Sequence, residues 1–195
     1  MDLEDAAQQS GVIPPERVAS LVSCLKAPDF GWLLTCPHST ERRLQGDVLS
    51  DFPVALVDSA GSPRCKQFTV LVLNNTCDLQ PQRSEFVTVA PVLDFGAFSQ
   101  HVIQKRGEAS AANYLKDVKA NRVFEILWLP AFGSFLYGAV VFLDKIGSVS
   151  SVVYESALAG DRRLASFSQN GFYFLLIKLT KHLARPESDE VFRLN

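Results

Sequence analysis

The segment from Phe68 to Phe95 constrains the fold of this chain more than any other part. Two runs rich in β-branched and aromatic residues, Phe68–Leu73 and Phe86–Val92, stand on either side of a polar stretch. Apolar runs bounded by Asn, Asp, Gln and Pro are typical of consecutive strands. The polar stretch opens with Asn74, Asn75, Thr76, Cys77 and Asp78. Because rigid scaffolds present polar groups at strand ends, we expect this corner either to bind a ligand or to fix the turn.

Further short strands surround this pair. The run Val48–Val57 is strand-like, and Pro53 within it favours an edge position or a bulge. Two more apolar runs follow residue 123, and residues 149–154 are a further strand candidate. Between them and the central pair, residues 97–121 are polar and compatible with helix, and Gly107 in the middle predicts two short helices. The sequence therefore predicts a mainly β, α+β fold with a helical insertion at about 97–121.

Helices are expected at both ends of the domain. After Pro14 and Pro15 an apolar i, i+3, i+4, i+7 stripe predicts an amphipathic helix. Near the other end, apolar residues surround the predicted helix instead of forming one stripe. Four of these are Phe172, Phe174, Leu175 and Leu176. Two alternatives stay open: the N-terminal helix covers this face, or a partner protein or a second copy does.

Length and composition indicate one domain. The chain has 195 residues, 47% of them hydrophobic and 21% charged. We expect a flexible acidic arm over residues 1–13, a single domain over 14–185 and a frayed tail over 186–195. The start lacks the apolar region of a signal peptide, and no run approaches 18 apolar residues. A cytoplasmic protein that does not enter a membrane is therefore expected.

Charge and cysteine spacing narrow the chemistry. The formal net charge of −2 provides no global attraction for nucleic acid, so such a site has to be a local patch. The four cysteines form neither a CxxC pair nor a disulfide framework. We therefore expect neither a metal site nor a cofactor.

Five short motifs recur in an order that resembles the MazF/PemK-type toxin family. They are Gly46-Asp47-Val48, the run Val70–Asn75, Val87-Thr88-Val89-Ala90-Pro91, Leu129-Pro130 before Gly133, and the run Val141–Val149. Together they cover roughly residues 44–183, with 97–121 as an insertion. The resemblance implies an SH3-like barrel with flanking helices and a place in a bacterial toxin–antitoxin or antiviral defence system.

The same resemblance implies where an RNA-cleaving site would lie. Such toxins use an arginine just before the second strand and a hydroxyl residue after the Ala-Pro strand. Here Gln67 and Leu93 occupy those positions, with Lys66 and Arg64 close by. The favoured function is therefore a non-catalytic or degenerate component acting through a partner protein or nucleic acid. An active endoribonuclease in which Arg64 replaces the displaced arginine is the alternative, so whether the chain is an enzyme stays open.

Candidate site residues fall into three groups. Cys77 beside Asp78 is the pattern of a cysteine-dependent enzyme, although a core cysteine followed by a turn-capping Asp is the more common case. Asp47 and Asp78 are candidates for a carboxylate pair, with turn roles as the alternative. Candidate polar and basic contacts to a ligand are Arg42, Arg43, Arg64, Lys66, Asn75 and Thr76. Surface cations of this kind often contact only water. The same two alternatives, a ligand contact or a solvated cation, apply to Arg162-Arg163.

Overall fold

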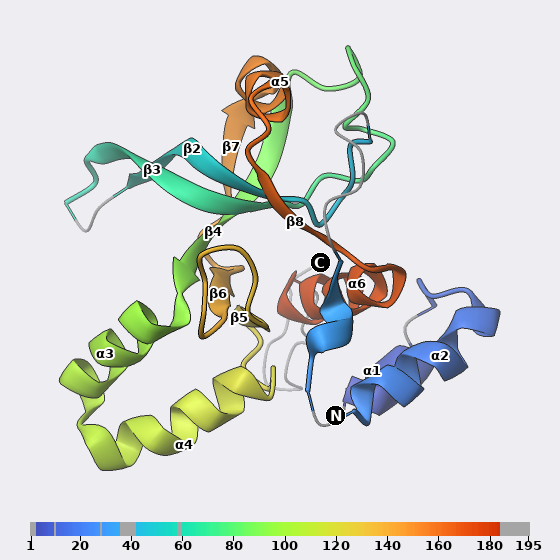
Figure 1. Cartoon of the computed structure of the whole chain (residues 1–195), viewed down its shortest axis with the longest axis vertical. Helices are drawn as coiled ribbons and strands as arrows, with labels where there is room; N and C mark the ends of the chain where they lie inside the picture. Colours follow the sequence, from blue (N-terminus) through green and yellow to red (C-terminus); the bar gives the residue numbers. More distant parts are fainter. Residues whose placement is uncertain (1–2, 10, 28, 36–41, 58–59, 184–195) are drawn as a thin grey trace, which may run out of the picture.

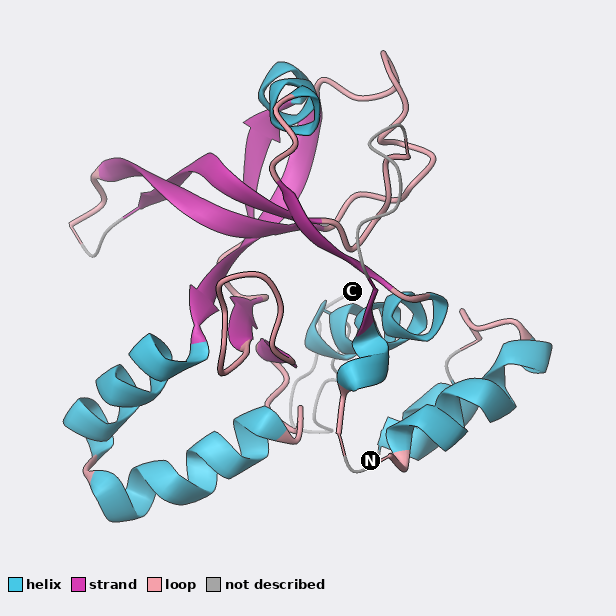
Figure 2. Cartoon of the chain, viewed as in Figure 1, coloured by secondary structure: helices cyan, strands magenta, loops and turns pink. Residues whose placement is uncertain are grey.

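A computed structural model describes residues 3–9, 11–27, 29–35, 42–57 and 60–183 (Figure 1). In this part of the chain, one eight-stranded antiparallel sheet is combined with six α-helices. The α+β class predicted from the sequence is therefore confirmed. Figure 2 shows the strands at the centre, with α3 and α4 to one side and α1, α2 and α6 to the other. None of the described helices is long and apolar enough to cross a membrane.

The bounds of the elements follow the chain order. The helices are α1 (Leu3–Gln9), α2 (Pro15–Leu25), the short 3-10 helix η1 (Gly31–Leu33), α3 (Phe95–Arg106), α4 (Glu108–Lys119), α5 (Ser151–Ala159) and α6 (Gln169–Leu183). The strands are β1 (Leu34–Thr35), β2 (Val48–Val57), β3 (Pro63–Val72), β4 (Phe86–Asp94), β5 (Ile126–Leu129), β6 (Ala139–Phe142), β7 (Gly147–Ser150) and β8 (Arg163–Phe167).

The sheet is open, whereas the resemblance implied a barrel. Its strand order is β1-β8-β2-β3-β4-β6-β5, and β7 pairs with β4 off this path. On the edge away from β3, β4 is shared by two strands: Phe86–Val89 pair with β7, and Val92–Asp94 pair with β6. The strand β7 then packs toward β2, where Gly147 lies against the side chain of Val54, but no ladder joins the two strands in the described residues.

The strands β2 and β3 form a long hairpin that projects from the sheet at the left of Figure 1. The register shifts between Leu49 and Phe52, where Asp51 adopts a positive φ of 55°. This irregularity bends β2 just before Pro53, so the bulge predicted from that proline is confirmed. Beyond the bend, the described outer parts of β2 and β3 extend away from the body of the sheet (Figure 1).

The helical insertion is confirmed as two helices. The side chain of Asp94 accepts a hydrogen bond from the Ala97 backbone N–H at 2.9 Å and caps α3. Gly107, with a φ of 77°, ends α3 and begins α4. Their apolar faces pack on β5 and β6 around Phe98 and Val140. The insertion is thus fixed to one end of the sheet.

Lys178 joins the insertion to the C-terminal helix. This lysine of α6 is buried, and its ammonium donates hydrogen bonds to the backbone carbonyls of Asn121, at 3.1 Å, and of Val123. Burial lowers the pKa of Lys178 to about 7, opposed in part by the nearby Glu125. The turn between α4 and β5 is therefore held by a side chain whose charge changes near neutral pH.

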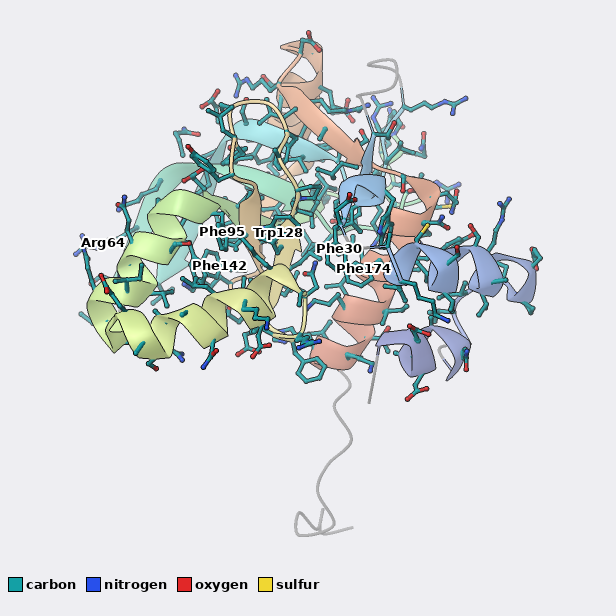
Figure 3. All side chains as sticks on the ribbon, turned by 60° about the horizontal axis from the view of Figure 1, so that its bottom comes forward. Phe30, Arg64, Phe95, Trp128, Phe142 and Phe174 are labelled. Carbon is teal, nitrogen blue, oxygen red and sulfur yellow. The ribbon has the colours of Figure 1, made fainter. Side chains whose placement is uncertain are left out.

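Helix α6 is covered within the chain itself. Phe174 and Leu175 are fully buried, and the ring of Phe174 lies at a tilt to that of Phe30, with centroids 5.9 Å apart (Figure 3). It also meets the ring of Trp32 edge to face, with centroids 5.7 Å apart. Phe172 and Leu176 are half-buried against the same core, which α2 also covers. Of the two alternatives for this face, the structure supports the covering N-terminal helix.

Three other expectations differ from the structure. The acidic segment predicted as a flexible arm contains α1, because Ala6 and Ala7 pack into the core beneath α6. The strand expected near Val149 stops at Ser150, whose hydroxyl accepts a hydrogen bond from the Val152 N–H and starts α5 instead. The strand β8 was not anticipated. The tail predicted at residues 186–195 lies outside the described residues.

Candidate functional site

The polar corner after β3 gathers most of the residues singled out in the sequence. Gln45 donates from its backbone N–H to Thr76 Oγ1 at 3.1 Å and from its amide to the Leu73 carbonyl at 2.7 Å. The carbonyl of Arg42 accepts a hydrogen bond from the Arg163 guanidinium. Arg43 forms a two-pronged ion pair with Glu155 of α5, at 2.9 and 2.7 Å, which raises the pKa of the Arg43 guanidinium.

A buried ion pair lies beneath this corner. The carboxylate of Asp47 lies 3.2 Å from the guanidinium of Arg163, and the two side chains are 0% and 3% exposed. The same carboxylate accepts hydrogen bonds from the Ser166 hydroxyl at 2.7 Å and the Leu44 N–H at 3.0 Å. Because this buried carboxylate already interacts with three groups of the protein, its role is to stabilise the fold. Asp47 is therefore not exposed for a ligand, and the expectation that Arg163 is solvated was wrong.

The structure does not build a reactive centre around Cys77. Cys77 and Asp78 are exposed on a turn that backbone bonds close, from the N–H groups of Asp78 and Leu79 to the Asn75 carbonyl. The Asp78 carboxylate, expected to cap this turn, has no hydrogen-bond partner among the described residues. The described histidines belong to α3 and α6, far from this turn (Figure 1), and His38 lies outside the described residues.

Asp47 and Asp78 do not form a carboxylate pair, since one is buried in an ion pair and the other is exposed on the turn. Within the described ranges no three His, Cys, Asp or Glu side chains gather in a way that could hold a metal ion. Thr76 fixes the corner, because its hydroxyl receives the Gln45 hydrogen bond, and Asn74 does the same by accepting from the Thr88 N–H. Asn75 contributes its carbonyl to the turn.

A cavity of about 200 Å³ adjoins this corner, between the 78–84 loop and α5. Its walls include Asp78, Glu155 and the ring of Tyr154. The Tyr154 hydroxyl is buried without a hydrogen-bond partner in the described structure, and burial raises its pKa well above the usual range. The phenol is therefore neutral at physiological pH. Among the described residues, the lining provides the carboxylates of Asp78 and Glu155 but no cation, and Arg43, which pairs with Glu155, is not part of it.

A second and larger hollow, here called the hairpin groove, lies between the β2–β3 hairpin and the turn from β6 to β7. Its volume is about 570 Å³. It is lined by Ala55, Val57, Arg64, Lys66, Phe68, Asp144, Lys145 and Ile146. Three of these side chains are cationic and one is anionic, so the groove is locally basic on a chain whose formal charge is −2.

Strand register explains why the cations gather there. In the β2–β3 pairing, Arg64 lies opposite Leu56, Lys66 opposite Val54 and Phe68 opposite Phe52. Because side chains alternate along a strand, Arg64, Lys66 and Phe68 lie on one face, the face on which Phe52 and Val54 enter the core. Phe68 is half-buried at the edge of that core, and the two cations beyond it are exposed.

The opposite wall of the groove is the β6–β7 turn. Lys145 in this turn is exposed and holds its ammonium 4.3 Å from the ring centre of Phe142. Asp144 and Ile146 flank it in the lining. Figure 3 shows Arg64 at the outer edge of the molecule, on the side of the α3–α4 insertion and away from Phe30 and Phe174.

The candidate residues thus divide between two places. Arg42, Arg43, Asp47, Asn75, Thr76 and Asp78 belong to the corner, whereas Arg64 and Lys66 belong to the hairpin groove. Figure 1 shows the corner at the upper right and the outer part of strands β2 and β3 at the left, so the structure does not join the two places into one site.

Of the groove-lining residues, the sequence interpretation found only Arg64 and Lys66, and it missed in particular the cation Lys145 and the aromatic Phe68. The period-two spacing of Arg64, Lys66 and Phe68 was a signal that these three share a face. No such signal existed for Lys145, because its position depends on how β7 folds back toward β2. Gln67 and Leu93, which stand where the resemblance expects catalytic groups, are both exposed, and neither lines the groove.

No known protein-family model matches this chain, and no curated protein sequence matches it either.

Proposed function

We propose that the protein is a non-catalytic, MazF/PemK-like component of a bacterial toxin or defence system that acts in the cytoplasm by binding single-stranded RNA in the hairpin groove. The family assignment comes from the order of sequence motifs. Within it, we take the curled part of the sheet formed by β2, β3, β4 and β7 as an open form of the SH3-like architecture.

The observation that carries this proposal is the composition of the hairpin groove. Sites for single-stranded nucleic acid combine a basic track for phosphates with aromatic surfaces on which bases stack. Here Arg64, Lys66 and Lys145 border a floor that contains Phe68. The lining includes neither histidine nor cysteine, and its one carboxylate is Asp144. This set supports binding more strongly than it supports acid–base catalysis.

The test is a titration of fluorescein-labelled 12-mer oligouridylate, followed by fluorescence anisotropy between 50 and 200 mM salt. Contact of the three groove cations with phosphates contributes about −2 to the slope of log K against log salt, since each phosphate on a single strand contributes about −0.7. The double variant Arg64→Ala/Lys66→Ala should therefore lower the magnitude of the slope by about 1.4 and weaken binding at 50 mM salt.

The matched control removes the same charge elsewhere. Arg17 on α2 and Arg83 in the loop before β4 are both exposed and outside the groove, so Arg17→Ala/Arg83→Ala should bind like the unmodified protein. Equal loss in both double variants would mean that net charge, and not the groove, causes binding. The absence of any salt-dependent binding would refute the proposal and favour a protein partner.

A second candidate function is an active endoribonuclease. The observation that favours it is the location of Arg64 inside the groove, close to where the resemblance places a phosphate-binding arginine. Cleavage of a long single-stranded RNA that Arg64→Ala abolishes would select this alternative.

A further inference from the structure

The helical insertion carries a second cation held on an aromatic ring, close to the hairpin groove. The guanidinium of Arg106, the last residue of α3, lies 4.1 Å from the ring centre of Tyr114 on α4. Arg106 is exposed and Tyr114 is half-buried. Such a pair presents a flat, charged surface of the kind that contacts phosphates and unstacked bases.

Aromatic contacts connect this pair with the wall of the groove. Tyr114 packs on Phe98 with centroids 6.4 Å apart, and Phe98 packs on Phe142 at 5.9 Å. Phe142 in turn is the ring beneath Lys145. The two cation–ring pairs, Lys145 with Phe142 and Arg106 with Tyr114, are therefore built on one aromatic cluster.

The electrostatics around Tyr114 agree with this proximity. The pKa of Tyr114 is raised, mainly because the ring is partly buried. Arg106 opposes this rise, and the carboxylates of Glu125 and Asp144 add to it. Asp144 also lines the hairpin groove, so the two places lie within electrostatic range of each other. Asp144 is the one carboxylate among the groove-lining residues, where it stands beside the three cations Arg64, Lys66 and Lys145.

We infer that a single strand bound in the hairpin groove continues over the Arg106–Tyr114 pair, so that the α3–α4 insertion forms the second half of one extended nucleic-acid track. This inference rests on the proposed function and adds to it a minimum length for the ligand. A short oligomer fills only the groove, whereas a longer one also contacts the insertion.

The test compares 4-mer and 12-mer oligouridylates by fluorescence anisotropy, with the 12-mer deoxythymidylate as an additional probe. We expect Arg106→Gln to weaken 12-mer binding about three- to tenfold at 50 mM salt and to reduce the salt slope by about 0.7, the contribution of one phosphate. Binding of the 4-mer should not change. Equal effects on the RNA and DNA 12-mers would show that the insertion contacts the phosphates and pyrimidine rings that both strands present, and not the ribose 2′-hydroxyl.

The insertion supplies its own control. Lys119 on α4 also lies over a ring, 4.8 Å from the centre of Phe95, but it lines a different cavity, with Glu4, Asp29 and Trp128. Lys119→Gln should therefore leave both oligomers unaffected, and thermal melting checks that both variants fold.

The outcomes separate the two claims. If Arg64→Ala/Lys66→Ala weakens 12-mer binding but Arg106→Gln behaves like Lys119→Gln, the extended track is refuted and the groove stands. If neither oligomer binds the unmodified protein, the proposed function fails and this inference fails with it.

Discussion

Replacing Asp47 with asparagine should destabilise the fold strongly, although the two side chains have nearly the same shape. The carboxylate is completely buried, lies 3.2 Å from the Arg163 guanidinium, and accepts hydrogen bonds from Ser166 and Leu44. Asp47→Asn leaves the Arg163 charge buried without its counter-charge. Breaking a buried pair in this way lowers the free energy of unfolding by about 3–5 kcal/mol. Urea denaturation followed by circular dichroism measures the difference.

Two further variants make the result specific. Asp117→Asn is the same substitution in an ion pair with Arg122 whose side chains are 48% and 70% exposed, and it should change stability by less than about 1 kcal/mol. The double variant Asp47→Asn/Arg163→Met removes both charges. Its loss of unfolding free energy should be smaller than the sum of the losses in the two single variants. If Asp47→Asn costs no more than Asp117→Asn, the buried network does not hold the corner together and the reasoning is refuted.

Three other outcomes follow from the packing of α6. Gly171→Ala should lower the melting temperature despite alanine's higher helix propensity, because the new methyl would lie 2.1 Å from the Leu33 carbonyl oxygen; an unchanged or higher melting temperature would contradict this contact. The pKa of Lys178 is about 7 in the folded state, against an ordinary value of 10.5. Between pH 7 and 10.5 the unfolded chain therefore binds more protons than the folded one. The free energy of unfolding should rise with pH across this range, by up to a few kcal/mol. Lys178→Met should lose this rise in urea titrations from pH 6 to 10, and identical pH profiles would argue against the burial of its charge. Light scattering should show a monomer for the unmodified protein. It should show aggregation for Leu21→Asp, because this variant places a charge in the core under α6. Larger assemblies of the unmodified protein would instead support α6 as a surface through which copies of the chain associate.

The parts of this fold that local sequence determines were predictable. The strands on either side of the Asn74–Asp78 corner follow from two apolar runs and the polar residues between them. The two insertion helices follow from Gly107, which ends one helix and begins the next. These features depend on residues close together in the chain.

The parts that depend on distant partners were not predictable. Arg163 follows another arginine and has the appearance of a solvated cation, and only the pairing of β8 with β2 brings it to Asp47. The barrel expected from the motif order also depends on distant pairing, and in the described residues no ladder joins β7 to β2 to close the sheet. Similarly, α6 has apolar residues on most sides, and no local pattern shows that η1, α1 and α2 cover them.

The candidate site was predicted in part. Arg64 and Lys66 were chosen as basic contacts, and the structure places both in one groove. The residues of the corner were chosen for the same polar character, but Asp47, Thr76 and Arg43 are occupied by contacts within the protein. Residue type alone does not separate a cation exposed at a groove from one buried in an ion pair, since only tertiary packing makes that difference.

The most direct test of the central claim combines binding and integrity of the ligand in one measurement. A long, end-labelled single-stranded RNA is incubated with the protein at 50 mM salt, and one half of the sample is run on a native gel and the other on a denaturing gel. Binding without catalysis predicts a retarded band on the first gel and full-length RNA on the second, with retardation lost in Arg64→Ala/Lys66→Ala but kept in Arg17→Ala/Arg83→Ala. Shortened RNA that Arg64→Ala restores to full length, or RNA that is neither retarded nor cut, would contradict the claim.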